Sequence, residues 1–352
     1  MAEALRRPGR ASRTAAEGSH HPERTLLAPH DYRGAAARIA PYIRRTPVLR
    51  AVVDGRAVSL KLEHLQVAGV FKIRGALNAL LSACPPHVVT ASGGNHGLGV
   101  ATAARWLGIP ATVFVPATVP EAKARRIAAQ GADVVKTGRV YADAERAARS
   151  LAAERGLCYV HAYDDPAVVA GQGTVGLEIA GDIPDWDAVA VPVGGGGLLA
   201  GVAGALFSGA PSPGGTSPGG TGAPRRVAAA ERRVAAAERR VVAAEPEGCP
   251  TLHAAIAAGE PVEVGADSVA ASALGASRAG EAALAACRAY PVITALVSDE
   301  QILSARDRLW EEFRLAVEPA AATVFAAWLS GQVPGENPCL VLSGGNADWT
   351  PA

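Results

Sequence analysis

The sequence predicts an α/β protein of two domains, each an open, mostly parallel sheet flanked by helices. Two observations predict this class. Short apolar runs typical of buried strands alternate with helical patterns between residues 87 and 207, joined by short connections. Glycine-rich loops also follow several of these strands, at the edge of a parallel sheet where ligands collect. A chain of 352 residues is long enough for two such domains.

The composition is that of a globular protein with a small-molecule partner. Hydrophobic residues make up 49% and charged residues 19% of the chain. The formal net charge of +1 gives no electrostatic reason to expect nucleic acid. The five cysteines are widely spaced and include no CxxC pair, which argues against disulfides and a zinc site and favours the cytoplasm. No apolar run reaches the roughly 18 residues that a membrane span needs, so no membrane contact is expected.

The chain is expected to open with a disordered tail over residues 1–28. Arginines occur early there without an apolar stretch behind them, which excludes a secretion signal and leaves an organelle transit peptide as a less favoured alternative. A helical pattern follows, and then two apolar runs, Val48–Val53 and Ala57–Leu62, predict a hairpin. The next helix is expected to open around Phe71–Lys72.

Strands and helices alternate from His87 onward. The predicted strands are His87–Ala91, Ala111–Val115, Asp133–Thr137, Cys158–His161, Ala188–Val193 and Pro338–Leu342, with a short apolar strand before Glu318. The predicted helices are Ala101–Leu107, Glu121–Gln130, Ala142–Glu154, Leu198–Phe207, Asp299–Phe313 and a last one ending at Leu329.

A flexible surface insertion is expected over residues 208–238. A tract rich in Pro, Gly, Ser and Thr is followed by the heptapeptide RRVAAAE at 225–231 and 232–238, with the close copy RRVVAAE at 239–245. A coiled-coil arm is one interpretation, but the heptads supply no full apolar seam. We favour a tandem duplication of a strand-forming segment, of which only the last copy forms a strand.

Lys72 is the candidate catalytic residue. A lysine at the start of a helix, flanked by Phe71 and Ile73, lies in an apolar pocket near the positive end of the helix dipole, which lowers the pKa of its amine. A neutral amine is a nucleophile. The alternative, an ordinary solvated lysine, is opposed by the motifs that surround it.

A second candidate site is the glycine run after the predicted strand Ala188–Val193. Its members are Gly194, Gly195, Gly196 and Gly197, and a helix is predicted to begin at Leu198. Glycines leave backbone amides unobstructed, so several amides can converge on a phosphate at the positive end of the helix. No Gly-Lys-Ser/Thr follows, which excludes a nucleotide P-loop, and a simple tight turn is the alternative.

Together with this glycine run, the motif around Lys72 resembles the serine/threonine dehydratase group of pyridoxal-phosphate enzymes. The matching residues are Glu63, Gly69, Phe71, Lys72, Arg74, Gly75 and Ala76. The resemblance covers about residues 40–207 and 239–350 and implies the tryptophan-synthase-β-like fold, or fold type II. It also implies a large cofactor-binding domain made of residues 29–86 and 165–352, and a small substrate-side domain made of residues 87–164.

The resemblance implies pyridoxal 5'-phosphate as cofactor, bound to Lys72 through a Schiff base. The implied cofactor-binding residues are Phe71, Lys72, Asn95, Gly194, Gly195, Gly196, Gly197, Leu198, Glu318 and Ser343, and the implied substrate-binding residues are Ser92, Gly93, Asn95 and His96. Val70 departs from the pattern, because the family commonly has a serine there that could cap the helix. Relatives hold a divalent cation near Glu245, but Cys249 and Thr251 replace other expected ligands, so no metal is predicted.

The implied reaction is β-elimination of a hydroxy amino acid such as L-threonine or L-serine to a 2-oxo acid and ammonia. Gly93 stands where racemases of the family place a serine, and glycine cannot carry a proton, so a racemase is disfavoured. A β-replacement synthase of the same fold and a non-catalytic binding protein are two further interpretations, both less favoured. The expected partners are the amino-acid substrate and copies of the same chain, in a homodimer or homotetramer.

Overall fold

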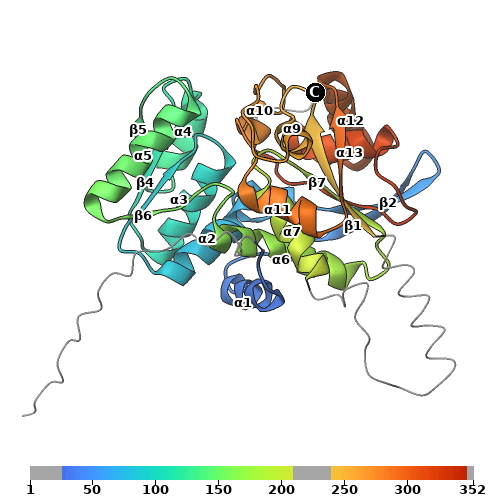
Figure 1. The fold of residues 1–352 in the computed structure, drawn as a ribbon, viewed down its shortest axis with the longest axis horizontal. Coiled ribbons are helices and arrows are strands. Elements are labelled where there is room, and N and C mark those ends of the chain that lie inside the picture. The colour runs from blue at the N-terminus through green and yellow to red at the C-terminus, as the bar shows by residue number, and fades with distance from the viewer. Residues whose placement is uncertain (1–25, 209–238, 347–352) are drawn as a thin grey trace, which may run out of the picture.

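Two sheets form the framework of the molecule (Figure 1). The computed structural model describes residues 26–208 and 239–346. The larger sheet has the order β1-β2-β10-β7-β8-β9. Its strands are β1 (Val48–Val53), β2 (Arg56–Lys61), β7 (Ala188–Pro192), β8 (Arg240–Pro246), β9 (Val292–Val297) and β10 (Cys339–Val341). Every neighbouring pair is parallel except the hairpin of β1 and β2, which confirms the predicted fold class.

The smaller sheet is parallel throughout and has the order β5-β4-β3-β6. Its strands are β3 (Val88–Ala91), β4 (Ala111–Val115), β5 (Asp133–Lys136) and β6 (Cys158–Tyr159). They all come from one continuous stretch of chain, whereas the larger sheet draws strands from both sides of that stretch. The limits of the two domains themselves stay a prediction.

The larger sheet is buried on both faces, as the sequence of β7 shows. Its residues alternate between two cores, because side chains of a strand point to opposite faces in turn. Ala188 and Ala190 pack in the core that contains α13 (Pro319–Leu329). Val189 and Val191 pack in the core that contains α7 (Gly197–Phe207). Helices on both faces explain why the strand is a continuous apolar run.

Lys72 lies where two cores meet. Val70 and Phe71 belong to the core of α7 and the larger sheet. Ile73 and Ala76, in helix α2 (Lys72–Ala83), belong to the core beneath the smaller sheet. The chain therefore passes from one core to the other at Lys72.

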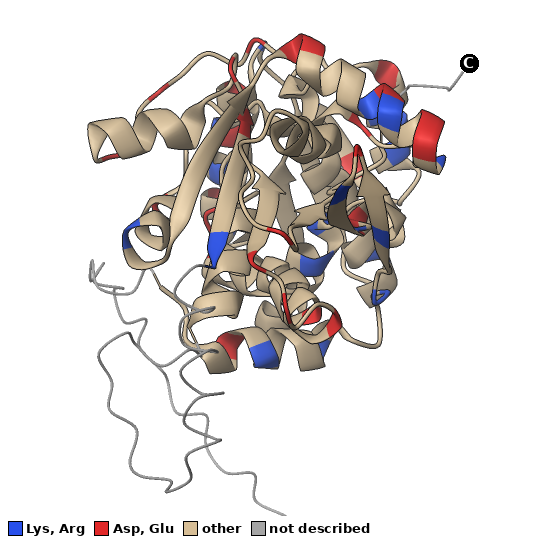
Figure 2. Ribbon diagram, turned by 90° about the vertical axis from the view of Figure 1, so that its right-hand side faces the viewer, with Lys and Arg blue, Asp and Glu red and all other residues tan. Residues whose placement is uncertain are grey.

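The remaining helices surround the sheets. They are α1 (Pro29–Ile39), α3 (Asn95–Leu107), α4 (Glu121–Ala128), α5 (Tyr141–Arg155), α6 (Pro166–Asp182), α9 (Thr251–Ala258), α10 (Ala271–Leu274), α11 (Glu281–Ala289) and α12 (Asp299–Phe313), with two 3-10 turns at Glu63–Leu65 and Val67–Gly69. None of the helices in the described ranges is long and apolar enough to span a membrane. Acidic and basic residues are interspersed along the outer helices and loops (Figure 2).

All the predicted elements but one are present, most of them within a few residues of the expected limits, and α12 has the expected limits. Two expectations are wrong. Helix α3 begins at Asn95, six residues before the predicted start at Ala101. The apolar run before Glu318 is not a strand, because its backbone completes the end of α12, where the Leu315 amide donates to the Leu309 carbonyl over 3.1 Å.

Helix α6 has 17 residues and was not predicted. Its sequence contains several glycines, which usually weaken a helix. Here they permit close packing of helices: a Cβ at Gly171 would lie 2.6 Å from the Arg74 carbonyl oxygen of α2. The segments α9 to α11 and β9 also carried no prediction.

Of the predicted N-terminal tail and insertion, residues 1–25 and 209–238 lie outside the described residues. The last copy of the heptapeptide, RRVVAAE, is found in β8, as predicted.

Four buried charged side chains fasten α2 to the larger sheet. Arg74 donates to Glu63 and to Glu178 of α6, with nitrogen–oxygen distances of 2.7 Å to each. Lys61, at the end of β2, donates to the second oxygen of Glu178 over 2.6 Å. Lys61, Glu63 and Arg74 are all 0% exposed. Buried charges are tolerated when they are paired and hydrogen-bonded, as these are.

We expect Arg74→Met to lower the free energy of unfolding by about 3–5 kcal/mol, because Glu63 and Glu178 would lose the guanidinium that neutralises them in a buried place. Urea unfolding monitored by circular dichroism measures this. Arg308→Met is the matched control: Arg308 pairs with Asp54 on the surface, and its loss should cost about 1 kcal/mol or less. Equal losses in the two variants would show that the buried network contributes nothing special.

Candidate active site

One cavity joins segments of both sheets. Its lining includes the start of α2, the loop between β3 and α3, the loop after β7, and the residues around α10. Six of the residues singled out in the sequence line it: Lys72, Ser92, Gly93, Asn95, His96 and Gly195. Loops at the carboxyl ends of β3 and β7 thus meet at one place, as expected for parallel sheets.

Lys72 is the first residue of α2, and its amine is well placed for nucleophilic chemistry. The amine donates to the Ala162 carbonyl oxygen over 2.8 Å and lies 5.2 Å from the centre of the Phe71 ring. Burial lowers the pKa of the amine to about 8, in the direction that the sequence predicted. A substantial fraction of the amine is therefore neutral slightly above neutral pH.

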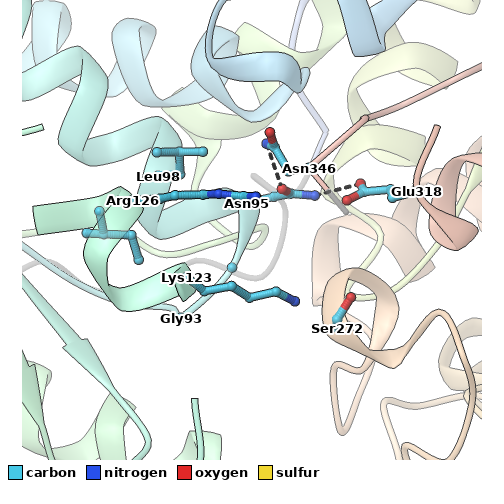
Figure 3. Close-up of a pocket in the computed structure, with 10 residues that line it drawn as sticks. Gly93, Asn95, Leu98, Lys123, Arg126, Ser272, Glu318 and Asn346 are labelled. Atoms are coloured by element: carbon cyan, nitrogen blue, oxygen red, sulfur yellow. Dashed lines mark hydrogen bonds between the residues drawn. The ribbon is translucent and has the colours of Figure 1, made fainter. Parts of the chain in front are cut away.

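Asn95 lines this cavity and also a neighbouring pocket that contains Glu318 and Asn346. Its side-chain amide, at the start of α3, donates to the Glu318 carboxylate over 2.6 Å (Figure 3). Its carbonyl oxygen accepts a hydrogen bond from the Asn346 side chain over 3.0 Å. Glu318 is the residue before α13 and is buried, which raises the pKa of its carboxyl to about 7.

Asn346 was not among the candidate residues, although a signal for it exists in the sequence. The tetrapeptide Ser-Gly-Gly-Asn occurs twice, at 92–95 and at 343–346. The two asparagines that end these copies are hydrogen-bonded to each other. Lys123 of α4 and Ser272 of α10 also line the cavity, with Lys123 extending toward Ser272 (Figure 3). No motif marks either residue.

Ser92 and His96 differ in what they offer to a ligand. The Ser92 hydroxyl accepts a hydrogen bond from the Gly94 amide over 3.2 Å and faces the cavity. His96 is 3% exposed, and its Nε2 lies 2.9 Å from the Thr90 hydroxyl. Burial lowers the pKa of His96 to about 3, so its ring is neutral. The ring is therefore hydrogen-bonded to β3 of the smaller sheet.

The glycine run has the backbone that a phosphate site requires. Gly196 has a φ of 85°, which favours glycine. A Cβ at Gly195 would lie 2.2 Å from the Tyr163 ring, so only glycine fits there. Gly197 opens α7, whereas the Leu198 side chain is buried in the core and leaves only its backbone for a ligand.

The end of β10 is tied to the segment that carries Lys72. The Phe71 amide donates to the Ser343 carbonyl over 3.1 Å, and Val70 forms an isolated β-bridge with Gly344. Ser343 is 3% exposed. No side chain caps α2, in keeping with the valine at position 70.

The donors present fit an aldehyde cofactor that carries a phosphate. The Lys72 amine, with its lowered pKa, and Gly195, in the glycine loop before α7, line the same cavity. Among the described residues, no three His, Cys, Asp or Glu side chains are grouped so that they could hold a metal ion.

Comparison with known proteins agrees with this geometry. Residues 39–344 match the model of the family described as pyridoxal-phosphate dependent enzyme. The L-threonine ammonia-lyase of Geobacter sulfurreducens is 36% identical over 322 residues, which cover 88% of this chain and 73% of that protein.

Two solved structures have the same architecture. The threonine deaminase of T.th. superposes with a TM-score of 0.78 and 34% identity, covering 92% of this chain and 100% of that one. The serine racemase of maize superposes with a TM-score of 0.77 and 29% identity, covering 92% and 94%. The chain belongs to the family of pyridoxal-phosphate dependent enzymes.

Proposed function

We propose that this protein is a pyridoxal-phosphate dependent ammonia-lyase that converts L-threonine or L-serine to a 2-oxo acid and ammonia. The similarity to L-threonine ammonia-lyase and threonine deaminase supports this proposal. The observation that carries it is the half-buried amine of Lys72, with a pKa of about 8, in one cavity with Gly195 and Asn95.

The chain's own residues would hold the cofactor at four points. Lys72 would form the covalent bond, the amides of Gly194–Gly197 would hold the phosphate, the Ser343 hydroxyl would serve as partner of the ring nitrogen, and Asn95 would serve as partner of the phenolic oxygen. Bound pyridoxal phosphate supplies an aldehyde that joins an amine and a ring that accepts electrons.

Lys72 would act as the base. Its amine would take the proton from the α-carbon of the substrate through Nζ. A pKa of about 8 suits this task, because an amine of ordinary pKa would remain protonated at neutral pH. The Ala162 carbonyl keeps Nζ in place between transfers.

The loop before α3 would hold the substrate carboxylate. Ser92 offers a hydroxyl, and the backbone at Gly93 and Gly94 lies at the amino-terminal end of a 13-residue helix, where anions are stabilised. Asn95 already donates to Glu318, so its remaining N–H is the donor left for a ligand.

Ser343 distinguishes elimination from transamination. A neutral hydroxyl does not stabilise a protonated ring as a carboxylate would, so the ring withdraws electrons less strongly. A weaker electron sink favours expulsion of the β-hydroxyl over long-lived delocalised charge.

We also propose that the protein is a cytoplasmic homodimer or homotetramer with the two domains named above, residues 29–86 with 165–352 and residues 87–164. The five cysteines are free thiols, which supports a reducing compartment. The origin of the smaller sheet in one continuous stretch supports the domain limits.

Replacement of the proposed base tests the site. Lys72→Ala should lower turnover by at least about 10³-fold, because both the covalent bond and the proton transfer are lost. Lys136→Ala, which removes an exposed lysine paired with Glu121, should leave turnover unchanged. Borohydride reduction and peptide mapping should place the cofactor on Lys72. A label on Lys123, the other lysine that lines the cavity, would contradict the assignment.

The pH dependence of cofactor capture tests the state of the amine. Only the neutral amine attacks the aldehyde, so the capture rate of the cofactor-free protein should rise with pH and level off above about 8. Stopped-flow absorbance measures this rate. A rate that keeps rising to pH values near 10, the ordinary range of lysine, would show that burial does not lower the pKa.

Position 93 tests elimination against racemisation. The wild-type protein should convert L-serine to pyruvate and leave D-serine near background, because glycine carries no proton donor. Gly93 does not have a positive φ, but a Cβ there would lie 2.2 Å from a Val119 methyl group. We therefore expect the double variant Gly93→Ser with Val119→Ala, rather than Gly93→Ser alone, to gain racemisation. Chiral chromatography of serine checks this, and a wild-type enzyme that interconverts the enantiomers faster than it makes pyruvate would sink the proposal.

A further inference from the structure

Glu245 is a buried carboxylate that the proposed reaction does not use. It lies near the end of β8 and is 0% exposed. Its two oxygens accept hydrogen bonds from the Leu252 amide over 2.7 Å and from the His253 amide over 2.9 Å. These amides belong to the first turn of α9, so Glu245 fixes the start of this helix against the sheet.

Thr251, the first residue of α9, links this carboxylate to the glycine run. Its hydroxyl donates to the Gly194 carbonyl oxygen over 2.5 Å and lies 3.1 Å from a Glu245 oxygen. A hydroxyl has a single proton to donate, and the shorter contact is to Gly194. The Thr251 hydroxyl is therefore held between the Gly194 carbonyl and the Glu245 carboxyl.

The direction of a carbonyl in the glycine run decides where the next amide points. In a trans peptide the carbonyl of one residue and the amide of the following residue point in opposite directions. The Gly194 carbonyl is turned toward Thr251, and the Gly195 carbonyl accepts from the Gly280 amide over 3.0 Å. The Gly195 amide therefore points away from Thr251, and the Gly196 amide points away from Gly280.

We infer that Thr251 is a positioning residue for phosphate binding: by holding the Gly194 carbonyl it aims the Gly195 amide at the ligand. This inference rests on the proposed role of Gly194–Gly197 as the phosphate loop. Glu245 contributes by fixing the helix that carries Thr251. The hydroxyl itself lies behind the loop and touches protein atoms on both sides.

Two probes separate phosphate binding from the rest of the site: pyridoxal phosphate and pyridoxal, which has the aldehyde without the phosphate. Their dissociation constants are measured by absorbance titration of the cofactor-free, full-length protein. Thr251→Val removes the hydroxyl at nearly constant volume. It should weaken pyridoxal phosphate binding by about fivefold to tenfold and change pyridoxal binding by less than about twofold. Thr251→Ser should restore the affinity for pyridoxal phosphate.

Thr323→Val is the matched control. Thr323 is also 0% exposed, and its hydroxyl donates within α13 to the Pro319 carbonyl. This variant should leave both dissociation constants unchanged. If Thr251→Val does not fold, Thr251→Ala removes the same hydroxyl and carries the same expectation.

The outcomes separate this inference from the proposed function. A wild-type protein that binds both probes equally would overturn the phosphate loop and the inference together. A wild-type preference for pyridoxal phosphate that Thr251→Val keeps in full would overturn the inference alone. An equal loss of affinity for both probes in Thr251→Val would also overturn the inference, because that result indicates general damage to the fold.

Discussion

The position of the reactive amine depends on a buried set of charges. Arg74 stands two residues after Lys72 and is clamped between Glu63 and Glu178, while Lys61 holds Glu178 from the other side. Charges withdrawn from water lose several kcal/mol of hydration each, and only close pairing offsets this loss. The four side chains therefore tolerate little displacement. Because Lys72 and Arg74 belong to the same first turn of α2, the contacts of Arg74 also set the place of Lys72.

This clamp also explains how a cavity can form between two separate cores. The segment before Lys72 is bonded to the end of β10, through the Phe71 amide and the bridge between Val70 and Gly344. From Ile73 onward the chain packs under the smaller sheet. The loop before α3 is joined to the start of α13 by the hydrogen bond from Asn95 to Glu318. These backbone contacts and this side-chain hydrogen bond thus hold the loops of both sheets around the amine.

Much of this could be predicted from the sequence, because local patterns control it. Buried parallel strands such as β7 are continuous apolar runs, and the loops after β3 and β7 follow from them. Helix α6 carried no prediction, and its glycines, which usually weaken a helix, permit the close contact with α2. The start of α3 was missed for a related reason: its first turn is part of a glycine-rich loop motif.

The part of the site that escaped prediction comes from residues whose contribution depends on packing between distant segments. Lys123 and Ser272 reach the cavity from α4 and α10, and no motif in the sequence connects them. In the sequence, Thr251 was notable only because it replaces a metal ligand expected from relatives. In the structure, its hydroxyl donates to the Gly194 carbonyl, 57 positions away. Only the assembled fold brings such pairs together.

The buried acids fall into two groups, and the difference suits an anionic cofactor. Glu63 and Glu178 are paired with the cations Arg74 and Lys61. Glu245 and Glu318 are held by amide and hydroxyl groups, and burial raises the pKa of each to about 7. A fixed negative charge beside the loop would oppose binding of a phosphate. A carboxyl with a raised pKa is protonated in part at neutral pH, so it keeps its hydrogen bonds while the repulsion is reduced, and the same residue type supports the fold in one place and the proposed phosphate site in the other.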